Sequence, residues 1–258
     1  MKLIDTHCHL VSDKLKDDLS EILLKAQAVG LEKIINVACD PASVLLALEQ
    51  LQFSPMLYAA LGIQPHDAQL FSRDEGEKIK HFALTNRRVV AIGEIGLDAY
   101  YTLSPMKKQI ECFDYFLEAA LDINLPVIVH VRETHQEVYT RLLQYSKLGL
   151  KGVIHCFTGT QEEARQFLDC GFYISFSGIV TFKNAKELQD TAKFVPNEKI
   201  LIETDSPFLS PMPLRGKLNE PSHIVHTNNF IANLRGQKPE EFANMTFNNA
   251  LKLFQIHD

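Results

Sequence analysis

The sequence predicts one α/β domain over residues 1–258, a (β/α)₈ barrel of the TIM type with two closing C-terminal helices. Short β-branched runs alternate with longer amphipathic stretches about eight times along the chain. The residues are 46% apolar, which suffices for one large core. A doubly wound open sheet would need a Gly-rich phosphate loop, and neither GxGxxG nor GxxxxGK[ST] occurs.

The expected strands and helices follow from the pattern of apolar residues and from the glycines and prolines that end them. Eight strands are expected, at 2–6, 33–38, 56–63, 89–96, 126–131, 152–157, 172–178 and 199–205. Six amphipathic helices are expected between them, at 17–30, 41–52, 109–123, 136–149, 161–171 and 185–195. Residues 223–236 and 239–254 read as the two closing helices, and several helices end at a glycine.

Charge and cysteine content limit the setting in which the protein works. The 26 basic and 32 acidic side chains leave a formal charge of −6, which argues against an extended basic surface for nucleic acid but not against a local phosphate site. Five cysteines without a CxxC pair fit a reducing cytosol. No secretory segment opens the chain and no apolar run approaches about 20 residues. We therefore expect a cytoplasmic protein that does not bind membranes, a monomer without an obligate protein partner.

Six metal-binding side chains fall where the predicted strands end. They are His7, His9, Glu94, His130, His155 and Asp205. Each has an ordinary explanation alone, as a loop histidine, a core histidine or a turn aspartate. Active-site groups of such barrels, however, lie at the C-terminal ends of the strands, so the six are expected to meet. A shared cation would also offset the cost of burying Glu94.

Several motifs resemble those of the TatD family of metal-dependent hydrolases, in the amidohydrolase-like superfamily. They occur in family order and span nearly the whole chain: DTHCH at 5–9, GEIGLD at 93–98, PVIVH at 126–130, IHCFTG at 154–159, ETDSP at 203–207 and LNEPSH at 218–223. Any one of them is weak evidence, but their combination is specific.

The resemblance implies a site with two divalent cations. His7, His9 and Asp205 would bind one, His130 and His155 the other, and Glu94 would bridge them. Asp205 would also be the catalytic residue that accepts the proton of the attacking water. Four imidazoles favour Zn²⁺ or Mn²⁺, while Mg²⁺ is associated with the family's nuclease activity. Asp98 is expected either beside a ligand or in a turn, and Glu203 either beside a histidine ligand or as an ordinary interior acid.

The mouth of the barrel is expected to bind substrate through His66, Arg132 and His135. Arg132 and His135 have an alternative role in capping or solvating the next helix, and Tyr100, Tyr101 and Phe157 either stack bases or pack. Two departures from the family pattern stand out. Gln64 replaces a histidine in GIQPH, and Leu218 occupies a position that is often arginine.

The function expected from this resemblance is phosphodiester hydrolysis, as a 3′→5′ deoxyribonuclease acting on DNA ends through a water activated by two metals. The substrate would be a DNA end or a small phosphorylated molecule. The alternative keeps the site and changes the bond, to an amide, an ester or a small phosphodiester.

Overall fold

A parallel sheet in chain order forms the centre of the molecule. The computed structural model describes residues 1–257, and their eight strands pair from β1 through to β8. The strands are β1 (Leu3–Cys8), β2 (Leu31–Val37), β3 (Leu57–Leu61), β4 (Val89–Asp98), β5 (Val127–Arg132), β6 (Gly152–Ile154), β7 (Tyr173–Phe176) and β8 (Ile200–Ile202). Beyond β8 the chain returns to β1 through a parallel bridge between Cys8 and Ser206, beside a hydrogen bond from Asp205 N to His7 O (2.9 Å). The predicted barrel is confirmed.

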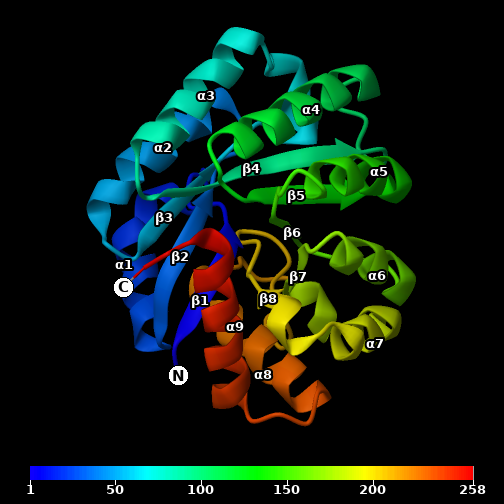
Figure 1. The fold of residues 1–258 in the computed structure, drawn as a ribbon. Helices are drawn as coiled ribbons and strands as arrows, with labels where there is room; N and C mark the ends of the chain where they lie inside the picture. Colours follow the sequence, from blue (N-terminus) through cyan, green and yellow to red (C-terminus); the bar gives the residue numbers. More distant parts are fainter. Residues whose placement is uncertain (258) are drawn as a thin grey trace.

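Helices surround this sheet (Figure 1). They are α1 (Leu19–Ala28), α2 (Pro41–Gln50), α3 (Arg73–Thr85), α4 (Met106–Asp122), α5 (His135–Ser146), α6 (Gln161–Asp169), α7 (Lys186–Phe194), α8 (Ile224–Leu234) and α9 (Pro239–Phe254). Six short 3₁₀ helices join them within the described residues: η1 (Lys16–Asp18), η2 (Leu51–Phe53), η3 (Pro65–Leu70), η4 (Gly178–Thr181), η5 (Asn197–Lys199) and η6 (Pro221–His223). Helix α3 is absent from the predicted set because it buries only Gly76, Ile79 and Ala83, too narrow an apolar stripe to stand out.

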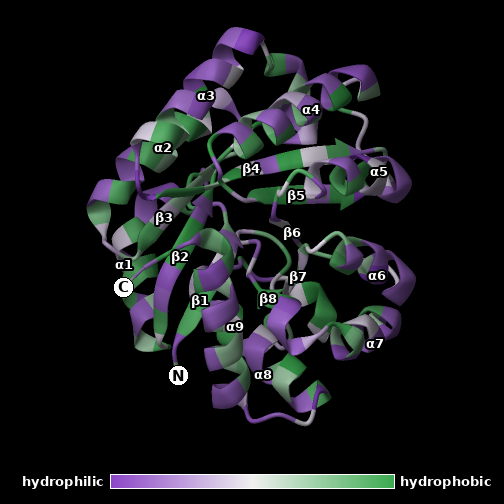
Figure 2. Cartoon of the chain, viewed as in Figure 1, coloured by the Kyte–Doolittle hydropathy of each residue, from purple (hydrophilic) through white to green (hydrophobic). Residues whose placement is uncertain are grey.

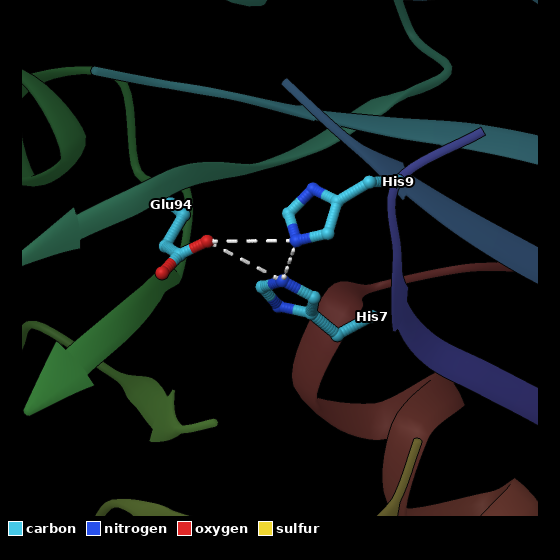
Figure 3. A group of neighbouring side chains, drawn as sticks. All are labelled: His7, His9 and Glu94. Carbon is cyan, nitrogen blue, oxygen red and sulfur yellow. Dashed lines mark hydrogen bonds and ion pairs between the residues drawn. The ribbon is translucent and has the colours of Figure 1, made fainter. Parts of the chain in front are cut away.

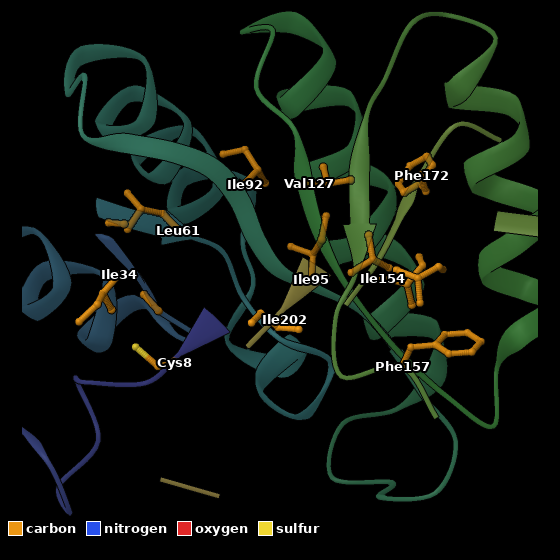
Figure 4. Close-up of a cluster of buried hydrophobic side chains, with 14 of the residues drawn as sticks. Cys8, Ile34, Leu61, Ile92, Ile95, Val127, Ile154, Phe157, Phe172 and Ile202 are labelled. Carbon is orange, nitrogen blue, oxygen red and sulfur yellow. The ribbon is translucent and has the colours of Figure 1, made fainter. Parts of the chain in front are cut away.

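Successive strand residues pack into two different cores. Ile200 and Ile202 join the larger cluster between strands and helices, part of which Figure 4 shows, whereas Leu201 joins a smaller cluster with Phe254. Strand side chains alternate between the two faces of the sheet, so each strand contributes to both clusters. The strands therefore appear in sequence as nearly continuous apolar runs. In Figure 2, β4 and β5 are mostly green, while much of the purple lies on the surrounding helices.

Helix α9 closes one end of the barrel. Phe247, Leu253 and Phe254 belong to the smaller cluster, packed with inward-facing strand residues. Asn249 donates to the carbonyls of Asn197 (2.7 Å) and Ile200 (2.9 Å), at the start of β8. The N-terminal ends of the strands are thus covered, which leaves the C-terminal ends for a pocket. No helix of residues 1–257 is long and apolar enough to cross a membrane.

Candidate metal centre

Four side chains meet at the C-terminal ends of β1 and β4 and just beyond β8. His7 Nε2 lies 3.1 Å from His9 Nε2 and 3.5 Å from Glu94 Oε2 (Figure 3). Asp205 Oδ1 lies 3.4 Å from His9 Nε2 and 3.8 Å from His7 Nε2. His7 lies on β1 and His9 just past its end, two residues further along the extended chain, so both rings project to the same side, as expected.

The second group shares Glu94 with the first. Its other oxygen, Oε1, lies 2.9 Å from His130 Nδ1 and 3.1 Å from His155 Nε2. The two imidazole nitrogens are 3.5 Å apart. Glu94 thus presents one oxygen to each group of donors.

Outer partners set which ring nitrogen is free to face the centre. His9 Nδ1 is 3.1 Å from the Val37 carbonyl, His155 Nδ1 is 3.3 Å from Glu203 Oε1, and His130 Nε2 is 3.0 Å from Asp98 Oδ2. Each of these oxygens can only accept, so the ring nitrogen beside it donates its N–H. The opposite nitrogen of each ring then faces Glu94, where it donates to the carboxylate when protonated and can bind a metal ion through its lone pair when not, the arrangement that metal-binding histidines adopt.

The backbone brings these groups together by a close approach of β4 to β5. Gly96 has φ +145°, and a Cβ there would lie 2.1 Å from the His130 carbonyl oxygen. Only glycine fits, because any side chain would push β5, and His130 with it, away from β4. Both Glu94 and His130 lie inside their strands rather than at the last residue, since β4 continues to Asp98 and β5 to Arg132.

The buried charges are strongly coupled. Burial would raise the pKa of Glu94, but His155 and hydrogen bonds from His130, His155 and His7 hold this pKa well below its usual range. Burial would lower the pKa of His155, yet the Glu94 and Glu203 carboxylates raise it well above its ordinary value. The carboxylate of Glu94 therefore stays charged and attracts positive charge to this point, either as protons on the rings or as a cation in their place.

The arrangement of donors fits divalent metal ions. Ligand atoms about 2.0–2.2 Å from one ion lie roughly 3.0–3.6 Å from each other. The separations measured here, 3.1 to 3.8 Å in the first group and 2.9 to 3.5 Å in the second, are close to that range. Imidazole nitrogens with carboxylate oxygens suit Zn²⁺ and Mn²⁺ well.

The centre opens into a pocket with a volume of about 1140 Å³, whose lining includes His66, Arg132 and Tyr101. The guanidinium of Arg132 stacks over Tyr100 and Tyr101, 4.0 and 4.6 Å from their ring centroids. Two of the three predicted substrate-binding residues thus face the pocket.

The third, His135, lies elsewhere. Its Nε2 is 2.8 Å from Gln166 Oε1, and its ring packs 4.7 Å from that of Phe167 on α6. It is not among the residues that line the pocket. The sequence showed only that His135 follows a strand. The direction of its side chain is set at the start of α5, which turns it toward α6.

Sequence reasoning overlooked Cys39, which lines the pocket beside the first group of donors. Its Sγ is 3.4 Å from His9 Nδ1 and 3.7 Å from Glu94 Oε2, and burial raises the pKa of the thiol to about 12. Cys39 directly follows the second predicted strand, and this position alone could have indicated that it lies near the centre.

Fold and site together define a barrel hydrolase that depends on metal ions, and comparison with known proteins agrees. The chain is 40% identical to an uncharacterized metal-dependent hydrolase, YabD of Bacillus subtilis, over 99% of this chain and 100% of the relative. It is 38% identical to YcfH of Escherichia coli, also named an uncharacterized metal-dependent hydrolase, over 99% of this chain and 97% of the relative.

The crystal structure of the TatD homolog YJJV from Escherichia coli superposes with a TM-score of 0.92 at 30% identity, covering 99% of this chain and 98% of that one. The family model described as TatD related DNase matches residues 4–255. The chain belongs to the TatD family.

Proposed function

We propose that this protein hydrolyses phosphodiester bonds at DNA ends, with two divalent cations bound at the centre. His7, His9, Glu94 and Asp205 would hold one cation, and Glu94, His130 and His155 the other. When bound, such a pair polarises a phosphoryl oxygen and lowers the pKa of a water. The observation that carries the proposal is Glu94, whose two oxygens serve the two groups of donors.

Asp205 is the proposed proton acceptor. Its carboxylate lines the pocket, and hydrogen bonding from His9 together with the nearby histidines outweighs burial and holds its pKa below the usual range. The group therefore stays ionised and can take a proton from a water beside it.

Arg132 is the proposed phosphate contact at the rim. Stacking on Tyr100 and Tyr101 holds its guanidinium in place, and it forms no ion pair with a carboxylate of residues 1–257. Its donors remain available to a phosphate oxygen, for which the planar guanidinium is well shaped. His66 lines the same pocket.

A second candidate substrate is a small phosphodiester, an ester or an amide. Leu218 is 50% exposed where the family often has arginine, and nearby Arg215 stacks on Phe182 with its guanidinium 4.4 Å from the ring centroid. Gln64 Nε2 donates to Asp67 Oδ2 (2.7 Å). Fewer basic contacts would suit a shorter substrate than a DNA strand.

The test is cleavage of a single-stranded oligonucleotide labelled at either end, by metal-stripped protein supplied with Zn²⁺, Mn²⁺ or Mg²⁺. We expect a ladder of single-nucleotide steps from the 3′ end. Asp205→Asn should lose this activity by more than about 100-fold, because the amide cannot accept the proton.

A wild-type protein that binds metal but leaves DNA intact would overturn the nuclease proposal. Hydrolysis of a small phosphodiester, ester or amide by the same preparation, again lost in Asp205→Asn, would establish the second candidate. Full activity of Asp205→Asn on any substrate would refute the role of Asp205.

A further inference from the structure

Asp98 is a fully buried carboxylate that accepts four hydrogen bonds. Its Oδ2 accepts from His66 Nε2 (2.9 Å) and His130 Nε2 (3.0 Å). Its Oδ1 accepts from the backbone N–H groups of Tyr100 (2.8 Å) and Tyr101 (2.7 Å). Each carboxylate oxygen therefore accepts hydrogen bonds from two donors.

These four donors belong to two functional parts of the pocket. His130 faces Glu94 with its other nitrogen and belongs to the second group of donors. Tyr100 and Tyr101 carry the rings on which Arg132 stacks, and the ring of His66 packs edge-on against Tyr101 at 5.5 Å. Within residues 1–257, Asp98 is the one side chain bonded to both parts.

We propose that Asp98 is a positioning residue that fixes the tautomer of His130 and, through the same carboxylate, the position of the rim that carries Arg132. By accepting the Nε2–H of His130, Asp98 leaves Nδ1 as the nitrogen that faces Glu94 and can bind a cation there through its lone pair. By accepting two backbone N–H groups, it holds the residues that follow β4 against the pocket. The inference rests on the proposed second cation position, but not on DNA as the substrate.

A cation held by His66, Asp98 and His130 is the rival explanation, since their polar atoms lie within 4.8 Å of one another. His130 would then have to bind metal through both ring nitrogens, because its Nδ1 already faces Glu94. The two ring N–H groups and two backbone N–H groups around Asp98 satisfy its carboxylate without any ion, so hydrogen bonding is the simpler account.

Asp98→Asn separates these roles because asparagine has one accepting oxygen and one donating NH₂. If the oxygen stays with Tyr100 and Tyr101, the NH₂ faces the ring of His130, which must then accept. The ring proton of His130 moves to Nδ1 and blocks the second cation position. The reversed amide would set its NH₂ against the N–H groups of Tyr100 and Tyr101, which cannot accept a hydrogen bond, whereas an imidazole can change tautomer; the first orientation is therefore favoured.

The experiment measures bound zinc per chain by elemental analysis after metal removal and reloading, together with a zinc titration. We expect Asp98→Asn to lose about one ion per chain or to bind the weaker ion about 10- to 100-fold less tightly. Asp67→Asn, a matched change on η3, should match wild type. Circular dichroism and thermal melting of the metal-free proteins identify any variant that fails to fold.

His66→Ala distinguishes the rival. It removes one donor from Asp98 but leaves His130 bonded, so its zinc content should equal that of wild type; a loss of zinc would support an ion at His66 and overturn our account. Wild-type zinc content and affinity in folded Asp98→Asn would also overturn it. These measurements contain no substrate, so they stand apart from any failure of wild type to cleave DNA.

Discussion

Glu94 shows how much a single side chain decides here. It is 3% exposed, and the rings around it come from residues as far apart in sequence as His7 and His155. Its charge would be costly to bury alone. The histidine rings on both sides of the carboxylate offset that cost. Because one oxygen faces each group of histidines, Glu94 joins the two groups into a single centre.

Glu94→Gln should therefore disable the centre while preserving its shape. Glutamine keeps one accepting oxygen and replaces the other with an NH₂ group, which repels a cation. We expect the loss of at least one metal ion per chain by elemental analysis and a loss of hydrolysis greater than about 100-fold, more than for an outer partner.

The matched control is Glu163→Gln, which alters the capping box of α6 and no donor of the centre. Its metal content should equal that of wild type. Two bound ions and full hydrolysis in Glu94→Gln would show that the carboxylate does not bridge.

At the scale of elements, Arg235 links the C-terminal end of α8 to the C-terminal end of α7. Its Nη1 donates to the carbonyls of Ala192 (2.5 Å) and Val195 (2.8 Å) at the end of α7, and Nη2 donates to Asn197 Oδ1 (2.6 Å). The last carbonyls of a helix lack partners within it and carry partial negative charge. One guanidinium thus caps α7 from the end of α8.

Arg235→Ala should lower the free energy of unfolding by about 2–3 kcal/mol, since several hydrogen bonds to a charged group are lost together. Arg165→Ala is the control: among residues 1–257 Arg165 forms an exposed ion pair with Glu162 and lies over the Phe194 ring, and its removal should cost less than about 1 kcal/mol. Urea unfolding measures both. Equal effects would show that capping from α8 contributes little.

At the scale of the whole molecule, stability and chemistry occupy opposite ends of the barrel. Helix α9 fills the N-terminal end with Phe247, Leu253 and Phe254, while the donors lie at the C-terminal end. Because the apolar packing lies at the other end, the end with the pocket can contain buried charges and an open cavity. Packing at the closed end stabilises the barrel that holds them.

Phe254→Ala should lower the free energy of unfolding by about 3–5 kcal/mol, because it leaves a cavity in the smaller core. The metal content and the turnover of each folded chain should not change. Phe53→Ala, at a residue 64% exposed, is the control and should have little effect on either. Urea unfolding and elemental analysis test this, and a loss of metal in folded Phe254→Ala would show that the two ends are coupled.

Sequence alone predicted the barrel and its strands, and it singled out the six side chains that the structure brings together. Alternation and apolar runs are local properties, and the polar residues that follow them identify strand ends in any parallel barrel. For the same reason His7, His9, Glu94, His130, His155 and Asp205 were all recognisable before the structure. A weakly apolar helix such as α3 was not, because its stripe is only three residues wide.

Only the tertiary structure decided how these residues meet. That Glu94 divides its oxygens, that Asp98 bonds His130, and that His135 turns to α6 depend on contacts between residues 31 to 87 positions apart, as the hydrogen bonds and ion pairs show. Sequence spacing carries no record of such distances. They arise when barrel closure and the close approach of β4 to β5 at Gly96 bring the strand ends together.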